Sequence, residues 1–156
     1  MLLKGVNHVA ILTKDTARLH AFYQEMFDAT IFADREEQPG VRLSFITIGD
    51  YAQLNVFEVS GNAEADKQVP MFGRGRIDHL GLEASDQEAF DEIRRRLMKS
   101  GASDGFVTDF GAAISVFFRD PDGLEGEVLL HNPSATAADL KGPGNPAAGY
   151  DQPAVS

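Results

Sequence analysis

Two histidines and one glutamate stand in patterns that suit metal-binding chemistry. His8 and His79 lie in two similar segments, residues 6–12 and 77–83, which share the order apolar, polar, histidine, apolar, small, apolar. Glu127 lies in an apolar run further along the chain. Two neutral imidazoles and one carboxylate can hold a divalent cation and leave positions open for water or substrate. We therefore predict that His8, His79 and Glu127 bind one divalent metal ion.

The strands expected at residues 6–12 and 77–83 leave space beside each histidine. Alternate side chains of a strand point to opposite faces, so Ala10 shares the face of the first histidine and Gly81 that of the second. A close-packed interior would usually fill such space, whereas a ligand groove requires it. A single histidine at a strand start is more often structural than a ligand, but the repeated position favours a shared role.

Glu127 is expected on a strand at residues 124–131, which follows the turn sequence at 120–123. On that strand it shares one face with Leu129 and His131. A carboxylate on a partly apolar face is costly to bury unless it is paired or coordinates a cation. His131 lies roughly 13 Å further along the strand, too far to bind the same ion, and is a candidate substrate contact.

An internal repeat predicts the fold. Seven residues after each histidine an aspartate, Asp15 or Asp86, is placed to cap a helix, and apolar residues then recur at helical spacing. Three β-rich segments follow each helix, at residues 30–33, 41–48 and 53–59 and at 105–108, 113–119 and 124–131. The expected organisation is an α+β protein with a first βαβββ module at residues 1–59, a linker at 60–76, a second βαβββ module at 77–131 and a flexible C-terminal tail at 132–156.

Composition narrows the classes of partner. The 156-residue chain has 24 acidic and 14 basic residues and a formal charge of −10, which disfavours a nucleic-acid partner. The absence of cysteine excludes disulfides and thiolate metal sites. The N-terminal residues lack the apolar stretch of a signal peptide, and no run of about 18 apolar residues could span a bilayer. We therefore expect a cytoplasmic protein without a membrane partner.

Residues 4–131 resemble the vicinal oxygen chelate superfamily, which includes glyoxalase I, methylmalonyl-CoA epimerase, extradiol dioxygenases, and fosfomycin- and bleomycin-resistance proteins. Three motifs carry the resemblance: Val-Asn-His-Val-Ala, Ile-Asp-His-Leu-Gly and Phe-Arg-Asp-Pro-Asp-Gly-Leu-Glu-Gly-Glu. The resemblance implies two modules that form a curved mixed sheet around a metal-binding groove. It also implies that the metal-binding glutamate stands four residues after Gly123, which is Glu127 and not Glu125.

The resemblance further implies a function. It predicts a metal-dependent enzyme that acts on a small oxygenated substrate by metal stabilisation of an oxyanion, as a lyase or isomerase or as a dioxygenase. Glu127 would be the catalytic residue, leaving the metal to act as a base, and the divalent ion would be Fe, Mn, Ni, Co or Zn. The alternatives are a bleomycin-resistance-like protein that sequesters a small molecule without catalysis, and a catalytically silent, metal-stabilised module. A homodimer is expected.

One departure from the family pattern concerns Asn55. The glyoxalase-like branch of the family has a fourth ligand, commonly Glu or Gln, in the last strand of the first module, and alignment of residues 53–56 with 125–128 puts Asn55 there. Asparagine is a weak metal ligand, so the pattern is closer to a three-ligand site. Asn55, Phe117 and His131 are the predicted pocket residues, whereas His20, among helix residues, is expected to be solvated or structural.

Overall fold

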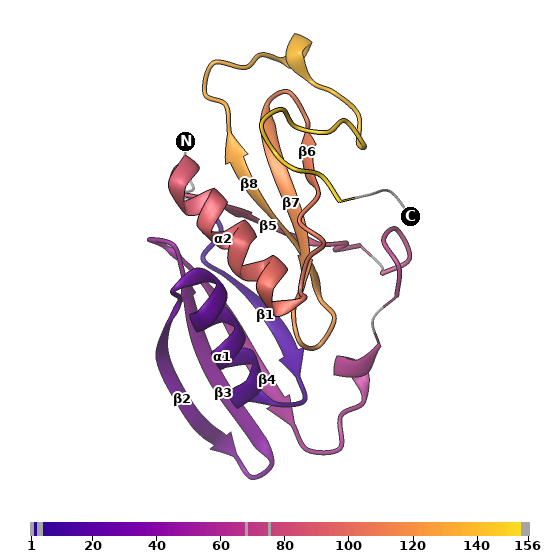
Figure 1. The fold of residues 1–156 in the computed structure, drawn as a ribbon. Coiled ribbons are helices and arrows are strands. Elements are labelled where there is room, and N and C mark those ends of the chain that lie inside the picture. The colour runs from indigo at the N-terminus through magenta and orange to yellow at the C-terminus, as the bar shows by residue number, and fades with distance from the viewer. Residues whose placement is uncertain (1, 3–4, 68, 75, 154–156) are drawn as a thin grey trace. The chain divides into compact units, whose positions relative to one another are not determined.

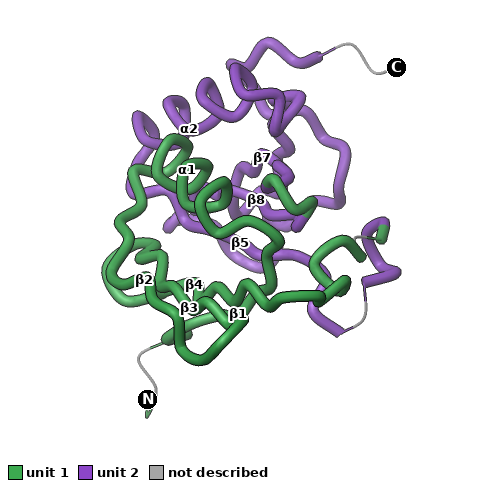
Figure 2. The backbone as a smooth tube through the Cα atoms, turned by 90° about the horizontal axis from the view of Figure 1, so that it is seen from below, with its two compact units in different colours: residues 1–69, 121–123 green, residues 70–120, 124–156 purple. Residues whose placement is uncertain are grey.

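The computed structural model describes residues 2, 5–67, 69–74 and 76–153 (Figure 1). The chain forms two compact units, which Figure 2 shows in different colours. The first unit comprises Met1–Val69 and Pro121–Gly123, and the second comprises Pro70–Asp120 and Leu124–Ser156. The boundary after Val69 falls inside the segment that the sequence marks as a linker.

The first unit contains one four-stranded sheet and one α-helix within the described residues. Its elements are β1 (His8–Thr13), α1 (Thr16–Phe27), β2 (Thr30–Gln38), β3 (Val41–Ile48), β4 (Ala52–Val59) and a short 3-10 helix, η1 (Glu64–Asp66). The strand order is β1-β4-β3-β2, with β1 parallel to β4 and the other neighbours antiparallel.

The described part of the second unit repeats this arrangement. Its elements are β5 (Leu80–Glu83), α2 (Gln87–Ser100), β6 (Val107–Asp109), β7 (Ala113–Arg119), β8 (Glu125–His131) and a 3-10 helix, η2 (Ala137–Asp139). The strand order β5-β8-β7-β6 again has one parallel pair, β5 with β8. The predicted α+β fold of two βαβββ modules is confirmed.

Both helices begin at the predicted caps. The Asp15 carboxylate accepts a hydrogen bond from the Arg18 amide at 2.9 Å, and the Asp86 carboxylate accepts one from the Ala89 amide at 2.8 Å. Each side chain thus satisfies an amide that has no partner within its helix. The repeat therefore extends from the histidines to the helix starts.

Each helix covers one face of its own sheet and so defines the hydrophobic core. In the first unit α1 contacts β3 and β4, and in the second α2 contacts β8. The core side chains are almost completely buried; they include Leu19, Tyr23, Met26, Ile46, Leu54 and Val56 in the first unit and Phe90, Leu97, Val116 and Val128 in the second. Because strand side chains alternate, the face opposite each helix carries the histidines and their small neighbours.

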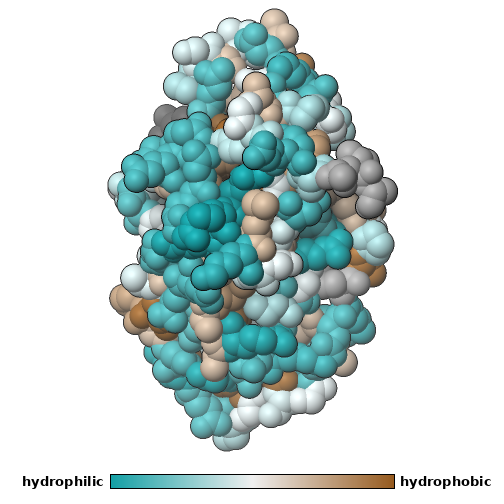
Figure 3. Space-filling view, viewed as in Figure 1, coloured by the Kyte–Doolittle hydropathy of each residue, from teal (hydrophilic) through white to brown (hydrophobic). Residues whose placement is uncertain are grey.

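The view in Figure 3 shows a mostly hydrophilic face with scattered hydrophobic residues. Scattered apolar residues of this kind are normal on a protein surface. Across the described residues, no helix has the length and apolarity that crossing a membrane would require.

Residues 132–153, which follow the last strand, make specific hydrogen bonds within the second unit; Figure 1 shows the path of this segment. The Ala147 amide donates to the Val107 carbonyl at 2.9 Å, and the Asp109 amide donates to the Asn145 carbonyl at 2.7 Å. The segment thereby pairs with β6, the edge strand of its sheet. Such pairing uses backbone groups, so it leaves no periodic pattern of apolar residues in the sequence.

A glycine and an ion pair fix the middle of this segment. Gly111 has a φ of +80°, and a Cβ atom there would lie 1.7 Å from the Asp139 carbonyl oxygen. The Lys141 amide donates to the Phe110 carbonyl at 3.0 Å, and its ammonium lies 2.5 Å from the Asp109 carboxylate. Only a residue without a side chain allows this close approach of two backbones.

The turn at Pro121–Gly123 belongs to the first unit, although it lies between two strands of the second. The Asp122 carboxylate accepts hydrogen bonds from the Thr13 hydroxyl and the Arg18 guanidinium, both at 2.5 Å. Its side chain is only 6% exposed. The sequence identifies Asp122 as a turn residue, and the structure adds that its charge is bound by the first unit.

Candidate functional site

The second unit brings His79 and Glu127 together. His79 directly precedes β5, and Glu127 lies in β8, where it is paired with Gly81 of β5. The distance from His79 Nε2 to Glu127 Oε1 is 3.3 Å. The side chains are 31% and 14% exposed, respectively, so the two polar groups meet at a partly solvated position.

Gly81 leaves space beside this pair. A Cβ atom on Gly81 would lie 3.6 Å from Glu127 Oε1 and 3.2 Å from the Leu129 side chain. Any larger side chain would extend further across the strand face that bears Glu127. The space predicted from the small residue after the histidine is therefore present next to the carboxylate.

Two residues of β7 flank the pair. The Ser115 hydroxyl donates to Glu127 Oε2 at 2.8 Å, which leaves Oε1 on the side of His79. The Phe117 ring meets the imidazole of His79 edge to face, with centroids 5.8 Å apart. Phe117, a predicted pocket residue, thus lies beside the candidate ligands. Sequence reasoning missed Ser115, although its alternation with Phe117 on β7 places both on one face.

Asp78 holds the other nitrogen of His79. Asp78 Oδ2 lies 2.9 Å from His79 Nδ1, and a carboxylate can only accept, so Nδ1 is the donor. This hydrogen bond is the main reason that the pKa of His79 is raised, with the nearby charge of Glu127 adding to it and burial opposing it. The same hydrogen bond lowers the pKa of Asp78. Nε2 is left as the nitrogen directed at Glu127.

His8, the other predicted histidine ligand, belongs to the first unit and begins β1. It is exposed, and its Nδ1 lies 2.8 Å from the Asn7 side-chain oxygen. Both histidines are thus held through Nδ1 by the residue that precedes them. Among the described residues, no group of three or more histidine, aspartate or glutamate side chains forms a cluster that could hold a metal ion.

Asn55 occupies in the first unit the position that Glu127 occupies in the second. It is paired with Ala10 of β1 and Phe45 of β3, just as Glu127 is paired with Gly81 and Phe117. Within the part of the chain that the structure describes, the Asn55 side-chain oxygen is buried and has no hydrogen-bond partner. The register therefore confirms the predicted alignment of Asn55 with the glutamate.

His131, the third predicted pocket residue, lines a different cavity. A pocket of about 810 Å³ lies in the second unit between the strand ends and the C-terminal segment. Its lining includes His131, Lys141 and Tyr150, but neither His79 nor Glu127.

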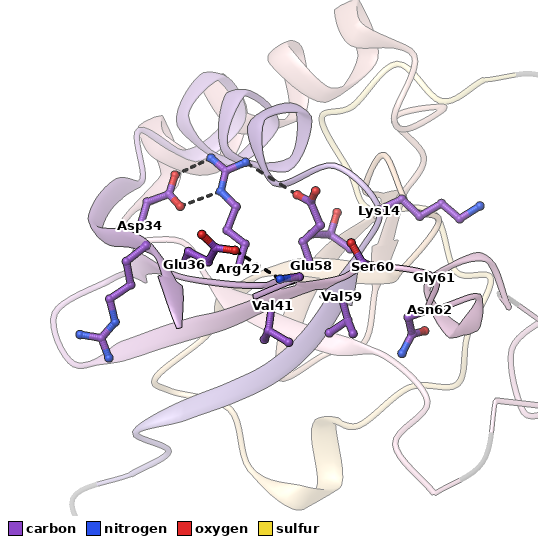
Figure 4. Close-up of a pocket in the computed structure, with 13 residues that line it drawn as sticks. Lys14, Asp34, Glu36, Val41, Arg42, Glu58, Val59, Ser60, Gly61 and Asn62 are labelled. Atoms are coloured by element: carbon purple, nitrogen blue, oxygen red, sulfur yellow. Dashed lines mark hydrogen bonds and ion pairs between the residues drawn. The ribbon is translucent and has the colours of Figure 1, made fainter. Parts of the chain in front are cut away.

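A second pocket, of about 680 Å³, lies in the first unit (Figure 4). Arg42 crosses it, with its guanidinium bound to both oxygens of Asp34 at 2.8 and 2.7 Å and 3.8 Å from Glu58. The Glu58 carboxylate also accepts a hydrogen bond from the Thr16 amide at 2.8 Å. Arg42 offsets part of the charge of these two carboxylates, and the lining as a whole holds three basic and three acidic side chains, Lys14, Arg35 and Arg42 and Asp34, Glu36 and Glu58. The lining therefore has no formal excess of either charge.

His20 lies next to Asp34 of this network and has a structural role, one of the two roles that the sequence indicates. Its Nε2 lies 2.8 Å from the Ser44 hydroxyl, and its Nδ1 lies 3.9 Å from Asp34. His20 is 9% exposed. Burial lowers its pKa and outweighs the opposing effect of Asp34, while Arg42 adds to the lowering.

The lowered pKa of His20 predicts acid destabilisation. In the unfolded chain the imidazole gains its proton near the ordinary value of about 6.5, so the contribution of His20 to stability is present above that pH. It is lost as the pH falls from there toward the lower pKa of the folded state. Between about pH 8 and pH 5, the melting temperature should fall more in the wild type than in His20→Gln. His131→Gln, at an exposed histidine, is the control and should follow the wild type; equal falls in all three proteins would contradict the prediction.

Comparison with known proteins supports the resemblance. The model of the Glyoxalase/Bleomycin resistance protein/Dioxygenase superfamily matches residues 5–128. No match was found among curated protein sequences. A glyoxylase/bleomycin resistance protein/dioxygenase domain from Frankia sp. EAN1pec is 22% identical, with 85% of this chain and 96% of that chain covered and a TM-score of 0.68.

Two further solved structures share the fold. Lactoylglutathione lyase from Agrobacterium tumefaciens is 24% identical, with 83% of this chain and 96% of that chain covered and a TM-score of 0.58. The fosfomycin resistance protein FosX from Listeria monocytogenes, complexed with Mn(II) and sulfate, is 17% identical, with 88% and 98% covered and a TM-score of 0.57. The family match and the shared fold lead to one conclusion: the chain belongs to the glyoxalase, bleomycin resistance protein and dioxygenase superfamily.

Proposed function

We propose that the protein is a metal-dependent enzyme that acts on a small oxygenated substrate, with His79 and Glu127 as two of the metal ligands. The observation that carries the proposal is the convergence of His79 Nε2 and Glu127 Oε1, 3.3 Å apart. The other donor atom of each group is already bound, by Asp78 and by Ser115. The two remaining atoms are those that a cation would use.

The donor set fits a divalent ion. Nitrogen and oxygen ligands lie about 2.0–2.2 Å from such an ion, so two neighbouring ligand atoms are roughly 3 Å apart, close to the separation seen between His79 and Glu127. Imidazole and carboxylate suit Fe, Mn, Ni, Co and Zn. His8 is the third ligand that the sequence predicts. Mn(II) in the FosX structure supports a divalent cation as the class of cofactor.

A divalent ion supplies a Lewis acid that stabilises negative charge on a substrate oxygen. Glu127 would leave the ion to accept, at Oε1, the proton that the substrate loses, while the hydrogen bond from Ser115 keeps Oε2 in place. Phe117 borders the imidazole, and Gly81 leaves room on the same face. These roles suit a lyase or isomerase, and with iron they also suit a dioxygenase.

Metal content after purification without a chelator tests the proposal. Wild-type protein and the variants His79→Ala, His8→Ala and His131→Ala would be analysed before and after incubation with each divalent metal. We expect near-stoichiometric metal in the wild type and in the His131 control, whose histidine lines another pocket, and loss of metal in His79→Ala. Loss in His8→Ala as well would support the third ligand.

Negligible metal in the wild type that no incubation restores would overturn the enzyme proposal. The alternative would then be a protein that sequesters a small molecule without catalysis. Binding of candidate ligands by metal-free protein, with no turnover under any added metal, would support that alternative.

A further inference from the structure

We propose that Asp78, held in place by Arg74, is a positioning residue that fixes the ring of His79 for binding through Nε2. The inference rests on the proposed function, because it concerns one of the proposed metal ligands. Asp78 itself would not touch the metal. Its effect would pass through the hydrogen bond between its Oδ2 and His79 Nδ1, which are 2.9 Å apart.

Both oxygens of the Asp78 carboxylate are engaged. Oδ2 accepts the hydrogen bond from His79, and Oδ1 accepts one from the Phe72 amide at 2.5 Å. The carboxylate is thus fixed at two points and cannot rotate without losing one of them. A fixed acceptor determines which nitrogen of the imidazole carries the proton and how the ring is oriented.

Arg74 contacts both the backbone carbonyl and the side-chain carboxylate of Asp78. Its guanidinium donates to the Asp78 carbonyl at 3.1 Å and lies 3.5 Å from Oδ2, while its other terminal nitrogen is bound to Glu125. The Arg74 side chain is only 7% exposed. The buried guanidinium offsets the negative charges of the two carboxylates. Because it is planar and rigid, it also restricts how these carboxylates can be oriented.

The internal repeat gives independent support. In the first unit Asn7 Oδ1 lies 2.8 Å from His8 Nδ1, so the residue before the histidine supplies the acceptor there too. Asn7 is neutral and Asp78 is charged, yet the hydrogen bond to Nδ1 is the same. The feature common to both repeats is therefore the acceptor, which makes orientation of the ring the shared role.

The consequence is a preset tautomer. A neutral His79 has one N–H for two carboxylates, and the shorter contact, 2.9 Å to Asp78 against 3.3 Å to Glu127, favours the proton on Nδ1. The lone pair is then on Nε2, where a cation between Nε2 and Glu127 Oε1 would use it. Carboxylates and carbonyls behind metal-binding histidines have this effect, and their loss typically costs tenfold to about 100-fold in metal affinity. We expect a loss of this size when Asp78 is truncated.

Three variants separate positioning from stability. Asp78→Ala removes the side-chain oxygen that accepts the hydrogen bond from His79. Asp78→Asn keeps an acceptor, a neutral amide oxygen like that of Asn7. Asp86→Ala is the matched control, since it removes an aspartate of the same unit whose carboxylate caps α2. It should lower the melting temperature without affecting His79.

Two measurements read out the effect. In metal-free, ¹⁵N-histidine-labelled protein at about pH 9, where imidazole is neutral, NMR should show the Nδ1–H tautomer of His79 in the wild type, Asp78→Asn and Asp86→Ala. It should show a mixture of tautomers in Asp78→Ala. Titration with zinc should give a tenfold to roughly 100-fold loss of affinity in Asp78→Ala, with the other two variants near the wild type.

The same tautomer and the same zinc affinity in Asp78→Ala as in the wild type would overturn the inference. If the wild type binds no zinc while the tautomer still depends on Asp78, the positioning role is supported and the proposed metal-dependent function fails. The tautomer measurement therefore distinguishes failure of the inference from failure of the proposed function.

Discussion

Replacing Glu127 with glutamine is expected to lower the affinity for divalent cations by more than the tenfold to roughly 100-fold that loss of a partner behind a ligand costs. Glutamine keeps the length of the side chain and can accept the hydrogen bond from Ser115. It removes the negative charge that would bind the cation beside His79. The fold should therefore persist while the proposed site fails, as calorimetric titration with Mn²⁺ or Zn²⁺ and the melting temperature would show.

Glu83→Gln is the matched control for this substitution. Glu83 lies in β5 next to β8, is exposed, and accepts a hydrogen bond from the His131 amide. The control makes the same change of charge on a neighbouring strand and should leave cation affinity within about threefold of the wild type, since weak surface charge interactions contribute little. If Glu127→Gln binds divalent cations as tightly as the wild type does, Glu127 is not a metal ligand.

Removal of residues 132–156 is expected to destabilise the second unit and to cause self-association. The deletion would expose the backbone groups of β6 that pair with Asn145 and Ala147, and a free edge strand is a template for pairing with another chain. It would also remove Tyr150 from its contact with the buried Phe90. A loss of about 2–4 kcal/mol corresponds to a fall of roughly 5–15 °C in melting temperature.

Scanning fluorimetry and light scattering after gel filtration would measure both effects. A single substitution tests the same contact more finely: Gly111→Ala places a Cβ against the Asp139 carbonyl, whereas Gly149→Ala, with a φ of +86°, meets nothing within 4 Å. Both alanines strain the backbone, but only the first displaces the segment. Equal protection from proteolysis at residues 137–141 in the two variants would contradict this account.

The sequence predicts the fold well because the repeat carries several signals at once. Each histidine has a small residue two positions later, then an aspartate that caps a helix, and then a helix with one apolar face. The second strand is the main difference: residues 30–33 are predicted, but β2 continues to Gln38. Its added residues are highly charged, and they pair with β3 across two register shifts, so an edge strand exposed to solvent shows no alternation of apolar residues.

The candidate site is only partly predictable from the sequence. Alternation shows which side chains of one strand share a face, and this identifies His79, Glu127 and Phe117. It does not give the register between strands, which pairs Glu127 with Gly81 and Phe117 and brings Ser115 within 2.8 Å of the carboxylate. The sequence does not indicate Arg74, because it lies in a polar, glycine-containing segment and only the folded chain shows that its side chain is buried.

The position of Asp122 affects how this duplicated protein can be divided. A polypeptide ending at Val69 carries one complete repeat but lacks Pro121–Gly123, which belong to the first unit. The hydroxyl of Thr13 and the guanidinium of Arg18 would lose the carboxylate that binds them. A gene split at the linker therefore encodes two fragments that form these two hydrogen bonds only when both are present. Such a split suits complementation of the two fragments better than expression of the first alone.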